Sequence, residues 1–264
     1  MNNNETIKKW VDFSVEVEHF VTNPPMAGAE IRVPPTHVEA AQVLMFHWGR
    51  GFRTYRSIHL LVISGFPDDA MVLLRVFLEI LFEMAFIAKH PEDSGLYLEN
   101  GKKTEIAWWR KIRKVVPDEM YAAAGFSEAV LASEIEDTKE KERKAPKSAW
   151  HPKYRSVRQR AIEAGAKPFL YDLVYSLASR YIHGSGDWMH ELACKEKRGI
   201  RINYTGSPKE GALAAMFANV CVVEQLEILN SCLDLKAESQ LNKLRENLNA
   251  LCSDEWKQAI EKYE

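Results

Sequence analysis

The longest apolar run of the chain, residues 70–88, is interrupted by three charged side chains, Arg75, Glu79 and Glu83. Their spacing of four places them in one stripe along an otherwise apolar helix. The run is about long enough to span a bilayer, but each central charge costs roughly 2.5–3.5 kcal/mol on insertion. We therefore predict a buried helix at about 68–90, whose charged stripe faces a polar seam, and no membrane span.

Apolar residues recur at helical spacing in further segments, which are separated by breaks rich in Pro and Gly. The pattern predicts helices at 6–21, 36–64, 95–115, 127–144, 154–164, 168–182, 212–235, 236–251 and 254–263. Thr36 is the expected cap of the second of these helices, and Gly49 and Gly51 are expected to bend it. A short β-hairpin is predicted near 199–204, too small to change the fold class.

These elements predict an all-α fold, a single helical bundle that takes in the whole chain of 264 residues. The 68–90 helix is expected at its centre, with the helices at 167–183 and 212–235 packed against it. A charged segment at about 137–155 is expected to be mobile, with a linker or mobile loop at 145–154. It overlaps the strongest local basic excess of the chain, nine Lys or Arg against two Glu in residues 139–160.

Composition narrows the functional classes. The formal net charge of −2 gives no chain-wide attraction to nucleic acid or to an anionic membrane, so either contact would need a local patch. The four cysteines form no C-x-x-C pair, which indicates reduced thiols in a cytoplasmic protein. The N-terminal residues do not resemble a signal peptide. Phosphate-binding loops, dinucleotide fingerprints and nucleophile elbows are absent from the sequence, and we expect no cofactor.

The charged stripe supplies the first candidate site. Arg75 and Glu79 are one helical turn apart on the buried helix, where charges are tolerated only when they are paired. We expect Glu79 to pair with Arg75, and Glu83 to pair with a residue of the helix that ends at His183. Such a network is either a purely structural ion-pair network or part of a functional site, and the sequence leaves both open.

The second candidate lies in residues 171–188, YDLVYSLASRYIHGSGDW. Tyr175, Ser179 and His183 follow one another at intervals of four, so they share a helix face. Ser179 is expected to hydrogen-bond His183, and Arg180 lies within reach of the same ring. A histidine at a helix C-terminus is either a general acid/base or a structural cap.

Two further patterns carry less chemistry. Arg53 and His59 are separated by five residues, an interval at which histidine moves protons and arginine stabilises phosphate charge in metal-independent RNA cleavage.

Metal-ligand residue types also cluster after position 182. Gly184 and Gly186 make a continuous helix unfavourable there, so that spacing has no fixed geometry, and we predict no metal site. The ligand types are His183, Asp187, His190 and Glu191.

The strings DDAMVLLRVFLEILFEMAFIAKHPEDSGLYLE at 68–99 and YDLVYSLASRYIHGSG at 171–186 resemble a bacterial family of helical proteins of unknown function. That family combines a Leu-Arg-x-x-x-Glu helix with an aromatic-rich helix ending in His-Gly or His-Pro. The matching residues are Arg75, Glu79, Tyr175, Ser179 and His183. The family in turn is similar to HEPN proteins, helical bundles that are often dimeric and often act as ribonucleases in toxin–antitoxin systems and phage defence.

The HEPN resemblance implies a homodimer that binds or cleaves RNA or a nucleotide. The usual HEPN signature places four to six residues between Arg and His. Arg53 and His59 meet this interval, whereas Arg180 precedes His183 by three positions. The implied roles are an acid/base for His183, phosphate binding for Arg75 or Arg180, and orientation of an arginine for Glu79, with Tyr175, Ser179, Arg53 and His59 as binding residues. The alternative is a non-catalytic scaffold or interaction module.

Overall fold

The structure is a computed structural model, and it describes the greater part of the helical bundle. The described residues are 3–23, 26–27, 37–95, 97–99, 156–182, 193–196, 199–202 and 206–252, with isolated positions at 111, 119, 132–133, 136 and 140. His183 and the other metal-ligand types near it lie outside the described residues. So do the 137–155 segment, apart from Glu140, and the helix predicted at 254–263.

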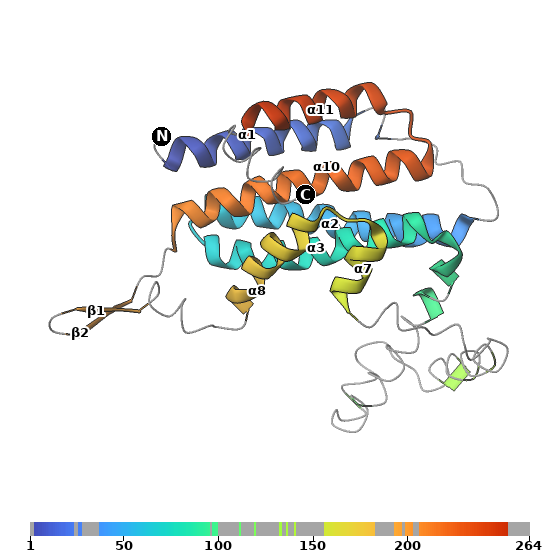
Figure 1. Cartoon of the computed structure of the whole chain (residues 1–264), viewed down its shortest axis with the longest axis horizontal. Coiled ribbons are helices and arrows are strands. Elements are labelled where there is room, and N and C mark those ends of the chain that lie inside the picture. Colours follow the sequence, from blue (N-terminus) through green and yellow to red (C-terminus); the bar gives the residue numbers. More distant parts are fainter. Residues whose placement is uncertain are drawn as a thin grey trace.

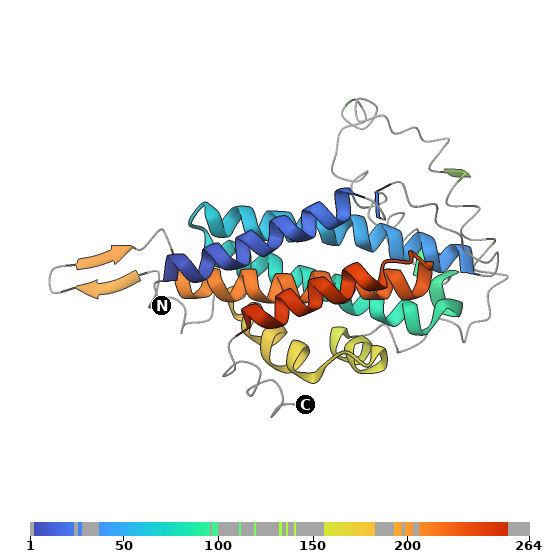
Figure 2. The same cartoon turned by 90° about the horizontal axis from the view of Figure 1, so that it is seen from above.

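The described elements confirm the predicted all-α class. They are α1 (Asn3–Thr22), α2 (Val38–Ile63), α3 (Pro67–Lys89), η2 (Pro91–Asp93), α7 (Val157–Ala164), η4 (Leu170–Tyr175), α8 (Ser176–Ile182), β1 (Ala193–Glu196), β2 (Gly199–Ile202), α10 (Pro208–Leu233) and α11 (Glu238–Leu251). The antiparallel β1–β2 hairpin projects from one end of the bundle and begins before the strand predicted at 199–204 (Figures 1 and 2).

The predicted apolar helix is α3, and it is the central element. It packs against α2 and α10 on one side and against α7, η4 and α8 on the other, while α1 and α11 cover α10 (Figures 1 and 2). Leu74, Leu78 and Phe82 of α3 have no exposed surface. Burial of side chains of this kind stabilises the fold by about 1.5–3 kcal/mol each. The expectation that the helices at 167–183 and 212–235 pack on this helix is confirmed for their described residues.

Local sequence explains where α3 and α7 begin and end. Pro67 stands in the first turn of α3, followed by Asp68 and Asp69, whose charges favour a helix N-terminus. Ser156 caps α7 by accepting a hydrogen bond from the backbone N–H of Gln159 at 3.1 Å. Gly165 ends α7 in the left-handed conformation, with φ of 70°.

Helix α2 differs from its prediction at its N-terminus. It runs without a break from Val38 to Ile63, and the bend expected at Gly49 and Gly51 stays a prediction. Gly51 allows a close approach to α10, because a Cβ there would lie 2.6 Å from Oε1 of Gln225. The N-cap position is His37 rather than Thr36, and its side chain makes no capping hydrogen bond.

Among the described helices, α10 is long and apolar enough by composition to cross a membrane. Its most apolar window is 67% buried inside the bundle, as a core helix would be. Length and apolar composition alone therefore do not separate a membrane-spanning helix from the core helix of a bundle. The position of α10 between α2, α3 and α1 accounts for its apolar character.

Candidate functional site

Three polar side chains close a hydrogen-bonded ring between α3 and η4, and we call them the Arg75 cluster: Arg75, Glu79 and Tyr175. Nη2 of Arg75 donates to the Tyr175 hydroxyl at 3.0 Å and lies 3.2 Å from Oε1 of Glu79. The Tyr175 hydroxyl donates to the same Glu79 oxygen at 2.9 Å. The predicted Arg75–Glu79 pair is therefore confirmed, and it gains an aromatic partner from a distant segment.

The cluster is partly open to solvent. The Arg75 side chain is 25% exposed and that of Glu79 is 33% exposed. The guanidinium also stands 5.2 Å from the centre of the Tyr175 ring, a cation–π distance. Burial and the hydrogen bond to Glu79 raise the pKa of Tyr175, so its hydroxyl stays protonated and keeps donating. Arg75 is thus held on two sides in one orientation.

A π-helical turn places Tyr175 in the cluster. The segment predicted as one α-helix at 168–182 is π-helical over Leu170–Tyr175 and becomes α-helical at Ser176. The i→i+5 hydrogen bonds of a π-helix widen each turn, and side chains four apart stay on one face, as they do in an α-helix. Tyr171 and Tyr175 accordingly stack, with ring centres 5.1 Å apart and planes at 16°. Single π-helical turns are frequent at functional sites.

The charged stripe of α3 continues from the Arg75 cluster to Glu83, which pairs with Arg160 of α7 at 2.9 Å. This corrects the expectation that the partner of Glu83 comes from the helix ending at His183. Helix α7 crosses this part of α3, whereas η4 and α8 cover the part around Arg75 and Glu79. Burial raises the pKa of Glu83, Arg160 lowers it and the nearby Glu79 raises it further.

A second pair lies near the far end of the stripe. The Nε2 atom of His47 and the hydroxyl of Tyr97 are 2.7 Å apart, in hydrogen-bonding distance. Burial lowers the pKa of His47 to about 4, and Arg50 lowers it in the same direction. Burial raises the pKa of Tyr97 to about 12, and the charge of Glu83 acts in the same direction. Both groups are therefore neutral at pH 7.

The remaining predicted residues of α8 do not complete a catalytic set within the described chain. Ser179 donates its hydroxyl hydrogen to the backbone oxygen of Tyr175 at 2.7 Å, and the expected bond to His183 stays a prediction because His183 lies outside the described residues. Serine inside a helix commonly makes this bond to the carbonyl four residues earlier. Arg180 is exposed at the end of α8. His183 follows the last residue of α8 and lies outside the described residues.

The structure separates Arg53 from His59. Arg53 is exposed on the outer face of α2, whereas His59 is only 5% exposed and lies in the core. The ring of His59 donates from Nε2 to Oδ1 of Asn219 at 3.1 Å. Burial lowers the pKa of His59 to about 4, although the bond to Asn219 acts in the opposite direction. The interval in sequence therefore does not bring the two side chains to one surface.

Two residues of the polar seam, Arg160 and Tyr97, are absent from the predicted site. The basic run at 139–160 contains Arg160, but a count of charges does not show which cation turns inward. Within the described part of the chain, no group of three or more His, Cys, Asp or Glu side chains could hold a metal ion. The chemistry that the Arg75 cluster offers is a fixed, partly exposed cation beside a carboxylate and a phenol.

Comparison with known proteins identifies a family. The sequence model of DUF5677, described as a family of unknown function, matches residues 41–198. The matched range contains the whole Arg75 cluster and the pair formed by Glu83 and Arg160. No curated protein and no solved structure matches the chain.

Proposed function

The chain belongs to the DUF5677 family of unknown function, and we propose that it is a cytoplasmic, HEPN-like protein that binds or cleaves RNA or a nucleotide at the Arg75 cluster. The substrate class comes from the resemblance of the 68–99 and 171–186 segments to HEPN proteins. A role in phage defence or in a stress response follows from the same resemblance.

The observation that carries the proposal is the state of Arg75. Its guanidinium is fixed by Glu79 and Tyr175, yet a quarter of the side chain is exposed. Its Nε atom is buried and has no hydrogen-bond partner among the described residues, so a ligand would contact the exposed remainder of the side chain. An arginine that is oriented in advance and stays partly exposed is suited to phosphate oxygens, which accept charge-assisted hydrogen bonds.

The proposed mechanism divides the roles among residues near the cluster. Arg75 holds a phosphate, and Arg180 at the end of α8 supplies a second cation. Glu79 keeps Arg75 in position and is not itself in contact with the reacting atoms. His183 acts as the acid/base, a role that rests on its sequence position directly after α8.

The test is RNA cleavage by the purified protein together with cell toxicity on expression. We would compare wild type with His183→Ala and Arg75→Ala, and use Lys243→Ala, an exposed cation of α11, as the control. The proposal expects both activities to fall at least tenfold in the first two variants, with unchanged melting temperatures and wild-type behaviour of Lys243→Ala. The proposal would be contradicted if the wild type neither cleaves nor binds RNA and the His183→Ala and Arg75→Ala variants melt at a lower temperature than the wild type.

A non-catalytic scaffold is the second candidate, and one observation favours it. Tyr175 and Glu79 already satisfy each other, and Ser179 bonds to the backbone, as a structural network would. Under this alternative Arg75→Ala lowers stability and changes no RNA-dependent signal.

We also propose that the protein is a homodimer, as the HEPN resemblance implies. Phe46, Leu60 and Ile63 support the proposal, because these large apolar side chains of α2 are 60–65% exposed. Size-exclusion chromatography with light scattering tests it. We expect twice the chain mass for wild type and a monomer for Leu60→Glu, and a monomeric wild type would contradict the proposal.

A further inference from the structure

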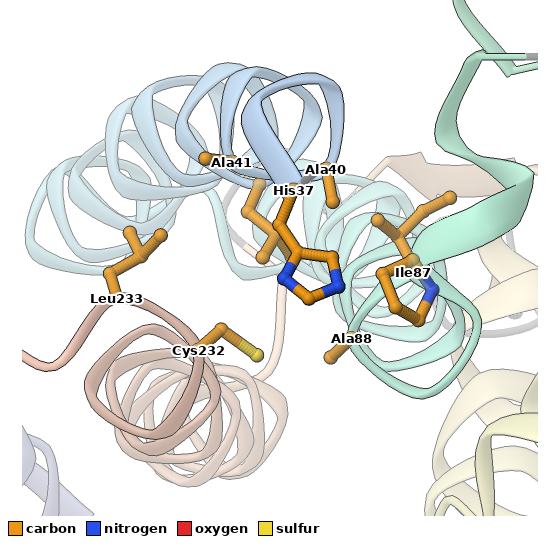
Figure 3. A pocket seen from close by; sticks show the side chains of 9 residues that line it. His37, Ala40, Ala41, Ile87, Ala88, Cys232 and Leu233 are labelled. Carbon is orange, nitrogen blue, oxygen red and sulfur yellow. The ribbon is translucent and has the colours of Figure 1, made fainter. Parts of the chain in front are cut away.

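A pocket far from the Arg75 cluster lies where three helices meet. The start of α2, the end of α3 and the end of α10 enclose a volume of about 200 Å³ (Figure 3). Its walls are largely aliphatic, with Ala40 from α2, Ile87 and Ala88 from α3, and Leu233 from α10. Burying an apolar ligand surface there is favourable because these walls cannot satisfy water.

Two of the residues that line this pocket carry polar or reactive groups: the imidazole of His37 and the thiol of Cys232. Figure 3 shows the imidazole of His37 and the sulfur of Cys232 directed into the space between the three helices. His37 is exposed, so its ring stands at the mouth, whereas Cys232 is half-buried and its thiol is free. The pocket therefore combines an apolar body with one imidazole donor at its entrance.

We propose that this pocket binds a small aliphatic carboxylate, with the chain against the apolar walls and the carboxylate against His37. The volume sets the size, because an apolar cavity of about 150 Å³ holds benzene. A chain of about six carbons therefore suits 200 Å³. The imidazole sets the head group, since it can donate to a carboxylate oxygen. The adjoining N-terminus of α2, where the side chain of the N-cap residue His37 makes no capping hydrogen bond, also favours negative charge.

The site is independent of the proposed RNA function. Ile87 follows Arg75 by twelve positions on α3, which corresponds to about 18 Å along a helix. Substitutions in the pocket therefore leave the Arg75 cluster in place. Success or failure of carboxylate binding can be judged whether or not the protein acts on RNA.

Cys232 provides a local readout of occupancy. The experiment is alkylation of the full-length protein by iodoacetamide, with and without hexanoate, followed by mass spectrometry of the peptides that contain Cys232 and Cys252. Hexanoate at ten times its dissociation constant slows the alkylation of Cys232 by about tenfold, by mass action. The rate at Cys252, which does not line the pocket, is unchanged and serves as the internal reference.

Variants separate the two parts of the proposed contact. Ala88→Leu fills the pocket and abolishes protection, while Ala250→Leu on the exposed face of α11 keeps it; equal melting temperatures show that both fold. His37→Ala weakens protection by hexanoate several-fold. Hexanol that protects as well as hexanoate would overturn the carboxylate assignment. Unchanged alkylation at saturating hexanoate, or equal protection in Ala88→Leu, would overturn the site itself.

Discussion

The bundle contains two polar clusters of similar composition in opposite surroundings. The Arg75 cluster joins α3 to η4 and is partly exposed. The second cluster joins α2 to α10 in the core: Asn219 is fully buried, and its Oδ1 accepts from Tyr55 at 2.6 Å and from His59 at 3.1 Å. Its Nδ2 donates to the backbone oxygen of Trp10 at 2.9 Å. We call this the Asn219 cluster.

The comparison shows that the residue types in a polar cluster do not decide whether it is structural or open to a ligand; burial decides this. Both clusters contain a tyrosine and a group able to move a proton or hold a charge. In the Asn219 cluster the groups are neutral and enclosed, and the side chains of Tyr55, His59 and Asn219 bond to one another, although Nδ1 of His59 has no partner among the described residues. This cluster therefore stabilises the contact of α1, α2 and α10. In the Arg75 cluster a charge stays at the surface of the α3–η4 contact, where a ligand can compete for it.

The largest expected effect is at the closed cluster. Asn219→Ala removes the partner of two side chains and one backbone carbonyl at once, and it leaves a cavity. We expect the free energy of unfolding to fall by about 4 kcal/mol. Urea denaturation measures it. A loss below about 1 kcal/mol would contradict the structural role of this cluster.

Low pH should destabilise the fold because two histidines, His47 and His59, are buried in their neutral form. Burial holds the pKa values of His47 and His59 at about 4, below the ordinary 6.5. As the pH falls from 6.5 to 4 the unfolded chain takes up these protons first, so stability is full above pH 6.5 and is lost toward pH 4. Each histidine accounts for about 3 kcal/mol. Urea denaturation at several pH values should show a dependence smaller by about that amount in His59→Gln, and an unchanged dependence would refute the assignment.

The Glu83–Arg160 pair should show an intermediate effect. Both side chains are about 15% exposed, at 16% and 14%, so Arg160→Met leaves a nearly buried carboxylate without its cation. Protonation of Glu83 limits the penalty because its pKa is already raised, and we expect a loss of about 2 kcal/mol. The double variant Glu83→Leu, Arg160→Met should recover most of it. Equal stability of Arg160→Met and wild type in urea denaturation would contradict this pairing.

The smallest effect on stability is expected at the open cluster. Tyr175→Phe removes one hydroxyl but leaves the Arg75–Glu79 pair and the ring packing, so it should cost about 1 kcal/mol or less. If the cluster binds phosphate, the same change should weaken RNA binding several-fold, because Arg75 loses one of its two anchors. A thermal melt and an RNA titration of the same sample separate the two effects.

Features that follow from the periodicity of an α-helix could be predicted from the sequence. The stripe of charges identified α3 as central, and the interval of four placed Arg75 beside Glu79. The π-helical turn at 170–175 could not be predicted, because its apolar pattern is also compatible with an α-helix. The partner of Glu83 depends on which helix crosses α3 at that point, which the charge pattern of α7 does not encode. Likewise, the interval from Arg53 to His59 says nothing about which face of α2 is covered.

The most direct test of the central claim is the affinity of the protein for single-stranded RNA measured against salt concentration, for wild type, Arg75→Gln and Lys243→Gln, the last being an exposed cation of α11. A phosphate held by Arg75 predicts that Arg75→Gln weakens binding by about tenfold and reduces the slope of log affinity against log salt by about 0.7. Lys243→Gln should change neither as strongly. If Arg75→Gln keeps its melting temperature and binds RNA with the wild-type affinity and slope, the Arg75 cluster is a structural network and not a site.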